Sequence, residues 1–219
     1  MKKYIIALVA IPLILLTSCA PESNDIYVSN DTYVSADEMT AVEEIITIQE
    51  LFEPKDSVIY IEGEPVSIKL YPFGEIIEDE EKASFVIFVE AYPRHRVEQQ
   101  DNLLRLTSNF DPPMGSPPIF MEITQIVDIT VDEAERQIKS DVDLVSHELF
   151  QNHATEDFPF NSIHLYEREL SWNAKVVSIY IKDNDRGGVF VITAQHSEEA
   201  YLVGARFRHY ISTMEIIDK

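Results

Sequence analysis

Residues 174–195 read AKVVSIYIKDNDRGGVFVITAQ, which is two β-rich runs separated by a polar segment that ends in two glycines. Valine, isoleucine and aromatic residues fit a pleated sheet, and Asp183–Gly188 has the composition of a hairpin turn. The stretch therefore predicts two antiparallel strands, Ala174–Lys182 and Val189–Gln195. The Asp-Asn-Asp of the turn also resembles the opening of a calcium loop. It lacks the downstream bidentate glutamate at the right spacing, which favours the turn.

The segments on either side of this hairpin extend the pattern. Ile163–Ser171 predicts a third antiparallel strand, and Ser197 is a candidate N-cap for a closing helix. Gly204 falls on the apolar face of that helix, where it would let the backbone lie close to the sheet, at a propensity cost of about 1 kcal/mol relative to alanine. The apolar face is formed by Ala200, Val203, Phe207, Tyr210, Ile211 and Met214.

The chain upstream predicts further strands and one clear helix. The strand patterns are Ser57–Ile61, Pro65–Tyr71, Phe85–Val89, Asn102–Asn109 and Ile119–Val127. Thr130-Val131-Asp132-Glu133 has the spacing of a capping box, and apolar residues follow at helical intervals as far as Leu149. We interpret the acidic run 78–81 as a solvated loop and not as a cation site. The sequence therefore predicts a single α+β domain over residues 57–219, with an antiparallel sheet flanked by helices.

The amino terminus has the features of an export signal. Met1-Lys2-Lys3 is followed by an apolar run that is too short to span a membrane, and Leu16-Thr17-Ser18-Cys19 looks like a bacterial lipobox around the only cysteine of the chain. We expect residues 1–18 to be cleaved and Cys19 to carry acyl chains that hold the protein to the lipid bilayer. The alternative is an ordinary cleaved signal with an incidental cysteine.

Residues 19–56 are rich in acids: after Cys19, residues 20–35 predict an extended tether, and a short helix is possible between Ser35 and Pro54. The mature chain would carry 15 lysines and arginines against 39 acids. Nucleic acid and anionic lipid would both meet a surface of like charge, so the acyl chains must supply the attachment to the membrane. We expect the protein at the cell membrane of a bacterium, lipid-anchored and facing the outside of the cytoplasm.

Three segments of the last third carry a resemblance to known proteins. They are Gly188-Val189-Phe190-Val191-Ile192-Thr193, Gly204-Ala205-Arg206-Phe207 and Ser212-Thr213-Met214-Glu215-Ile216. The chain resembles uncharacterised bacterial lipoproteins and, more distantly, the PsbP-like domains named for an extrinsic subunit of the photosynthetic oxygen-evolving complex. The resemblance implies an α/β/α sandwich whose relatives mostly bind or stabilise other proteins.

Positive charge gathers at two places in this acidic chain. If the fold brings them together, they would form a site for an anion, whether a carboxylate, a phosphate or an acidic partner peptide. Alternatively, each arginine pairs with one of the many nearby acids. The residues are Arg94, His95 and Arg96, and then Arg206, Arg208 and His209.

Aromatic residues in the strand region are a second candidate, for a pocket lining or for the core: Trp172, Tyr166, Tyr180 and Phe158. The sequence predicts no catalytic residue, metal site or cofactor, because it contains no zinc-type cluster, nucleophile elbow or phosphate loop. We therefore expect a non-enzymatic module that binds or stabilises another envelope component. The alternatives are a cell-envelope hydrolase and a small-ligand-binding lipoprotein.

Overall fold

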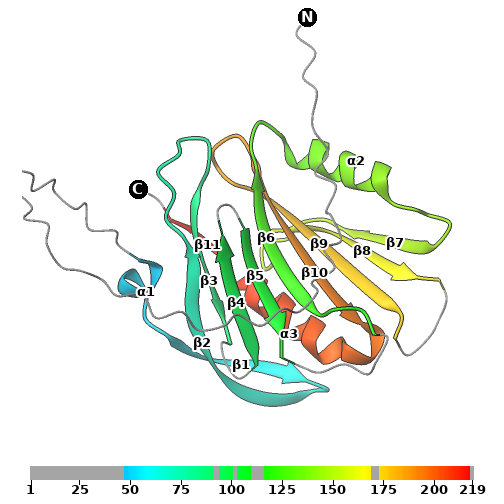
Figure 1. Cartoon of the computed structure of the whole chain (residues 1–219), viewed down its shortest axis with the longest axis horizontal. Coiled ribbons are helices and arrows are strands. Elements are labelled where there is room, and N and C mark those ends of the chain that lie inside the picture. Colours follow the sequence, from blue (N-terminus) through cyan, green and yellow to red (C-terminus); the bar gives the residue numbers. More distant parts are fainter. Residues whose placement is uncertain (1–46, 91–93, 101–102, 110–115, 169–172, 218–219) are drawn as a thin grey trace, which may run out of the picture. The chain divides into compact units, whose positions relative to one another are not determined.

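The computed structural model describes residues 47–90, 94–100, 103–109, 116–168 and 173–217, which are drawn in colour in Figure 1. The predicted signal peptide, Cys19, the tether and Trp172 lie outside these residues. So does the predicted helix from Ser35, except for its last turn, which is the short helix α1 (Ile48–Leu51). All the described residues belong to one unit of the chain, Glu44–Lys219.

The described strands form two antiparallel sheets. The four-stranded sheet has the order β1 (Lys55–Ile61), β2 (Glu64–Glu75), β3 (Ser84–Val89), β11 (Glu215–Ile217). The seven-stranded sheet has the order β4 (His95–Gln100), β5 (Leu103–Ser108), β6 (Phe120–Ile126), β10 (Val189–Ser197), β9 (Lys175–Asp183), β8 (Asn161–Glu167), β7 (His147–Asn152). The helices are α1, α2 (Val131–Asp141), the 3₁₀ turn η1 (Glu198–Ala200) and α3 (Tyr201–Ser212). The predicted α+β class with antiparallel pairing is confirmed.

The hairpin predicted at 174–195 lies inside the larger sheet as β9 and β10, with Tyr180 opposite Ile192. Its turn is closed by Asn184, whose buried side-chain Oδ1 accepts hydrogen bonds from the backbone N–H groups of Arg186 (2.9 Å) and Gly188 (2.8 Å). Gly187 adopts a positive φ of 82°, which a residue without a Cβ reaches without strain. The Asp-Asn-Asp segment is therefore a turn, as its composition predicts.

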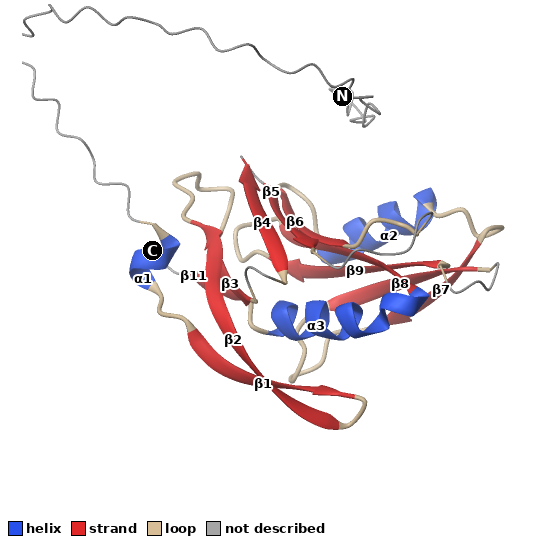
Figure 2. Ribbon diagram, turned by 60° about the horizontal axis from the view of Figure 1, so that its bottom comes forward, coloured by secondary structure: helices blue, strands red, loops and turns tan. Residues whose placement is uncertain are grey.

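The two faces of the seven-stranded sheet bury different helices. One face packs Ile163, Ile181 and Val189 against Ala134 of α2. The other face packs against α3, and α3 in turn contacts the four-stranded sheet, so it lies between the two sheets (Figure 2). The shared core contains Leu106, Met121, Phe190 and Ile192 of the larger sheet, Leu70 and Val86 of the smaller one, and Phe207, Tyr210 and Ile211 of α3.

The predicted helix from Thr130 begins as expected but is shorter than predicted. The Thr130 hydroxyl accepts from the backbone N–H of Glu133, which completes the capping box. The helix ends at Asp141, Val145 is 85% exposed, and Leu149 lies in strand β7. Asp143 explains the stop, because its carboxylate accepts hydrogen bonds from Val145 N (3.0 Å) and Ser146 Oγ (2.7 Å) and so stabilises a turn in place of another helical turn.

Gly204 brings α3 close to strand β10, as its position on the apolar face predicts. A Cβ added at this residue would lie 2.5 Å from Nε2 of His196. The His196 ring is buried, and its Nδ1 is 2.8 Å from the carbonyl oxygen of Ser197, which fixes its orientation. The ring cannot turn aside without losing that hydrogen bond.

Gly204→Ala should therefore destabilise the protein. Overpacking typically costs about 1–3 kcal/mol, which outweighs the gain of about 1 kcal/mol in helix propensity. The midpoint of urea unfolding measures the change. The double variant Gly204→Ala/His196→Ala should lose less stability than the two single changes added together, because the contact is then gone. An increase in stability for Gly204→Ala alone would show that helix and strand are not in close contact.

Candidate functional site

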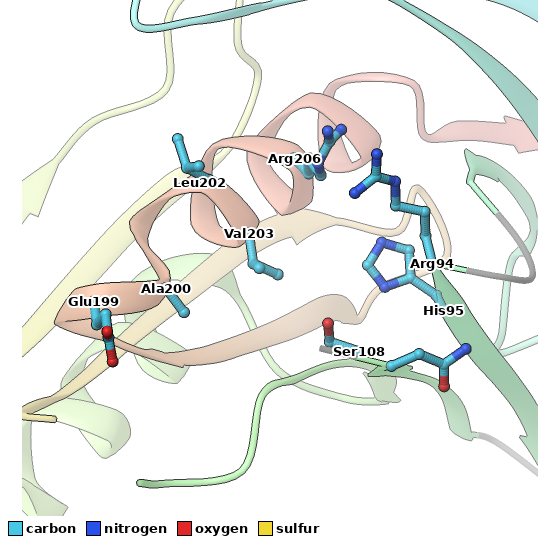
Figure 3. A pocket seen from close by; sticks show the side chains of 9 residues that line it. Arg94, His95, Ser108, Glu199, Ala200, Leu202, Val203 and Arg206 are labelled. Atoms are coloured by element: carbon cyan, nitrogen blue, oxygen red, sulfur yellow. The ribbon is translucent and has the colours of Figure 1, made fainter. Parts of the chain in front are cut away.

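A cavity of about 490 Å³ lies between helix α3 and the adjoining ends of strands β4 and β5 (Figure 3). One wall is formed by the adjoining ends of β4 and β5. His95 and Ser108 are paired across the two strands, and next to them the N–H of Asn109 donates to the carbonyl of Arg94 (2.8 Å). The other wall is one face of η1 and α3, where the lining residues recur at helical spacing. The lining residues are Arg94, His95, Ser108, Asn109, Glu199, Ala200, Leu202, Val203 and Arg206.

A largely buried carboxylate, Glu90, adjoins the two arginines of the cavity, and its side chain is 12% exposed. It follows strand β3 and accepts hydrogen bonds from Arg206 Nη1 (2.9 Å) and from the Tyr210 hydroxyl (2.7 Å). Arg94 approaches the same carboxylate more loosely, with its Nε 3.8 Å from Oε1. The Arg206 side chain is 8% exposed, whereas that of Arg94 is 59% exposed. Two guanidinium groups therefore share one carboxylate, and the more exposed of them has the looser contact.

His95 extends this network through Tyr210. Its Nε2 is 3.1 Å from the Tyr210 oxygen, and the Tyr210 hydrogen is donated to Glu90. We therefore assign the proton of the imidazole to Nε2, which leaves a lone pair on Nδ1. Among the residues that the structure describes, Nδ1 has no hydrogen-bond partner, although His95 is only 3% exposed. Beside the cavity, a buried acceptor is thus left without a donor from the residues that the structure describes.

The environment keeps both rings of this network neutral. Burial, reinforced by the charges of Arg206 and Arg94, lowers the pKa of His95 to about 4. Burial and the hydrogen bond to Glu90 raise the pKa of the Tyr210 hydroxyl far above its ordinary value. At neutral pH the imidazole is uncharged and the phenol keeps its proton.

The fold brings together three of the six residues predicted to form an anion site: Arg94, His95 and Arg206. The other three have separate partners. Arg96 pairs with Glu98 (2.9 Å) on the surface, Arg208 lies over the ring of Phe158 (5.0 Å), and His209 Nε2 is 3.0 Å from Ser57 Oγ.

The sequence offered little reason to choose Glu90, which is the residue that organises the site. The only local signal is its position as a charged residue directly after the apolar strand β3. Both arginines of the cavity contact this acid. Such pairing is the alternative to an anion site that the sequence left open. Whether the cavity also takes an external anion stays a prediction.

A second cavity of about 390 Å³ lies between α3 and strands β8 to β10, with Tyr166 and Tyr180 in its lining. Phe158 meets Tyr180 edge to face at 5.7 Å, so these predicted aromatic residues do gather. Ser162 Oγ is 3.1 Å from Nε2 of His164, and Ser178 Oγ is 2.8 Å from its Nδ1. His164 thus has a serine hydroxyl beside each ring nitrogen. In a catalytic serine–histidine pair, one of these positions would hold an acid that orients the imidazole.

Two features are absent from the described residues, a metal-binding cluster and a membrane-spanning helix. No group of three or more histidine, cysteine, aspartate and glutamate side chains is placed to hold a metal ion within them. None of the helices in this part of the chain has both the length and the apolar character that crossing a bilayer requires. No protein-family model matches the chain, and no curated protein matches it either.

Glu90→Gln should destabilise the protein strongly. The change leaves the buried Arg206 without a charge partner, and removing one member of such a pair typically costs about 3–5 kcal/mol. Glu98→Gln is the matched control, because it breaks the exposed pair with Arg96, which is worth at most about 1 kcal/mol. Urea unfolding of both variants tests this, and equal losses would show that Glu90 is not the buried centre of the network.

The low pKa of His95 predicts a pH dependence of stability. In the unfolded chain this histidine takes up a proton near pH 6.5, but in the folded protein only near pH 4. The contribution of neutral His95 to the free energy of unfolding is complete above pH 6.5. It is lost as the pH falls towards 4, at up to about 1.4 kcal/mol per pH unit.

Unfolding free energies of the wild type and of His95→Gln between pH 7 and pH 4 measure this contribution as a difference in slope. His164, His196 and His209, whose pKa values are lowered by burial, contribute with the same sign in both proteins. Their effect therefore cancels in the comparison. Identical slopes would show that His95 is not held neutral.

Proposed function

We propose that this protein is a bacterial lipoprotein, held to the cell membrane by acyl chains on Cys19 and facing the outside of the cytoplasm. The lipobox pattern and the single cysteine support this location. The packing of α2 and α3 on opposite faces of the seven-stranded sheet supports a PsbP-like α/β/α arrangement within residues 57–219. The acidic tether would hold the folded part away from an anionic bilayer that repels it.

We further propose that the folded part binds another molecule and does not catalyse a reaction on it. The network around Glu90 carries this proposal. Catalytic acids and bases are tuned to exchange protons near the working pH, whereas here the pKa of His95 is lowered to about 4 and that of Tyr210 is raised. These groups offer a fixed acceptor and fixed charges, which are the features of a binding site.

The partner we favour is another component of the cell envelope. A formal net charge of −22 repels nucleic acid and favours a partner with a basic surface. The cavity of about 490 Å³ supports a second candidate, a lipoprotein that binds a small ligand, because its volume lies in the range typical of small-molecule sites. The two candidates differ in what should copurify with the protein.

Crosslinking of the full lipidated protein in its native membrane, followed by mass spectrometry, tests the proposal. We expect the wild type in the membrane fraction, crosslinked to an envelope protein. Cys19→Ala is the matched control: it should leave the membrane fraction and keep the thermal unfolding profile of the wild type. Recovery of lipid alone with the wild type would contradict a protein partner, and tight membrane association of Cys19→Ala would contradict the anchor.

A further inference from the structure

We propose that the cavity between α3 and strands β4 and β5 binds a short free peptide, with the carboxylate of the peptide at Arg94 and Arg206 and its amino group at Glu199. The inference rests on the proposed binding function and names the class of ligand. The ligand is a peptide of about three residues with both ends free. Three features of the cavity support it in turn.

The first feature is the excess of positive charge at one end. Figure 3 shows the guanidinium groups of Arg94 and Arg206 at the same end of the cavity. They share the carboxylate of Glu90, so these three described side chains together carry one net positive charge. The contact of Arg94 with Glu90 is long, with Nε 3.8 Å from Oε1, and the fork of donors on Arg94 suits a second carboxylate. A single added carboxylate would balance the charges.

The second feature is an acid at the opposite end. Glu199 lies seven positions before Arg206 on the same helical face, which corresponds to about 10 Å along the axis. Figure 3 shows its carboxylate at the far end of the cavity from Arg94. An extended peptide spans about 3.3–3.6 Å per residue, so three residues reach from one end to the other. The charges and their separation therefore match the two termini of a tripeptide.

The third feature is the surface between the two ends. Ala200 and Val203 of the helical wall are apolar and suit a small hydrophobic side chain. Across from them, the His95 ring lines the cavity, and its buried Nδ1 has no partner among the described residues, so a peptide N–H that reaches it would supply the missing donor. A fatty acid would offer the carboxylate but no such donor. A simple inorganic anion would not reach Glu199.

Isothermal titration calorimetry of the detergent-solubilised, lipidated full chain with the tripeptide Ala-Leu-Ala tests the inference. We expect measurable binding of the free tripeptide. Amidation of its carboxyl end or acetylation of its amino end should each weaken binding tenfold or more, because each removes one of the two charges. Arg94→Gln should weaken binding of the free peptide about tenfold, but should leave binding of the amidated peptide unchanged.

Glu199→Gln should give the mirror result, with weaker binding of the free peptide and unchanged binding of the acetylated one. Both residues are exposed, so their substitution leaves the buried pair of Glu90 and Arg206 in place. The matched controls are Arg96→Gln and Glu198→Gln, whose side chains lie outside this cavity, and both should bind the free peptide as the wild type does.

Three results would overturn the inference. They are no heat of binding at millimolar tripeptide, equal affinity for the free and amidated peptides, and equal affinity for the free and acetylated peptides. The last would mean that the cavity takes the end of a longer chain. Capture of an envelope protein by crosslinking, without binding of the tripeptide, would leave the proposed function standing and remove only the peptide.

Discussion

The carboxylate of Glu90 is largely buried where the two sheets and helix α3 meet. A charge that is mostly removed from water is tolerated only if the surrounding groups neutralise it and satisfy its hydrogen bonds. Arg206 and Tyr210 reach it from the helix, and Tyr210 passes the network on to His95 in the first residue of β4. One acid after β3 thus links the four-stranded sheet, the helix and the seven-stranded sheet. Moving any of these three elements would leave a charge or a donor unpaired.

The apolar packing of α3 makes such a polar junction possible. Phe207 and Ile211 are fully buried between the sheets, and Gly204 lets the helix approach His196 closely. The part of this helix that the sheets do not cover forms one wall of the cavity. The charges around that cavity follow from the junction, because Glu90 is shared by two arginines and satisfies the buried one more fully than the exposed one.

The cavity contrasts with the rest of the chain. A net charge of −22 repels other anions, yet the described side chains at one end of the cavity carry an excess of positive charge, and the uncharged His95 lies beside them. In our proposal the acyl chains on Cys19 overcome the repulsion from the membrane, and the cavity supplies local selectivity. Attachment and recognition would then reside in separate parts of the chain, joined by the acidic tether.

Local sequence patterns determined the α+β class, the antiparallel hairpin of β9 and β10, the closing helix and the close approach at Gly204, because periodicity and turn chemistry act over a few residues. They failed where local signals conflict or are weak. The helix from Thr130 ends early because Asp143 stabilises a turn, and β4 has a polar sequence that forms a strand only beside β5.

Only the tertiary structure decided which of the six predicted anion-site residues line the cavity. Arg94, His95 and Arg206 do, whereas Arg96, Arg208 and His209 do not. The acid that selects among them, Glu90, is 116 positions from Arg206, and no local pattern encodes a contact over such a distance.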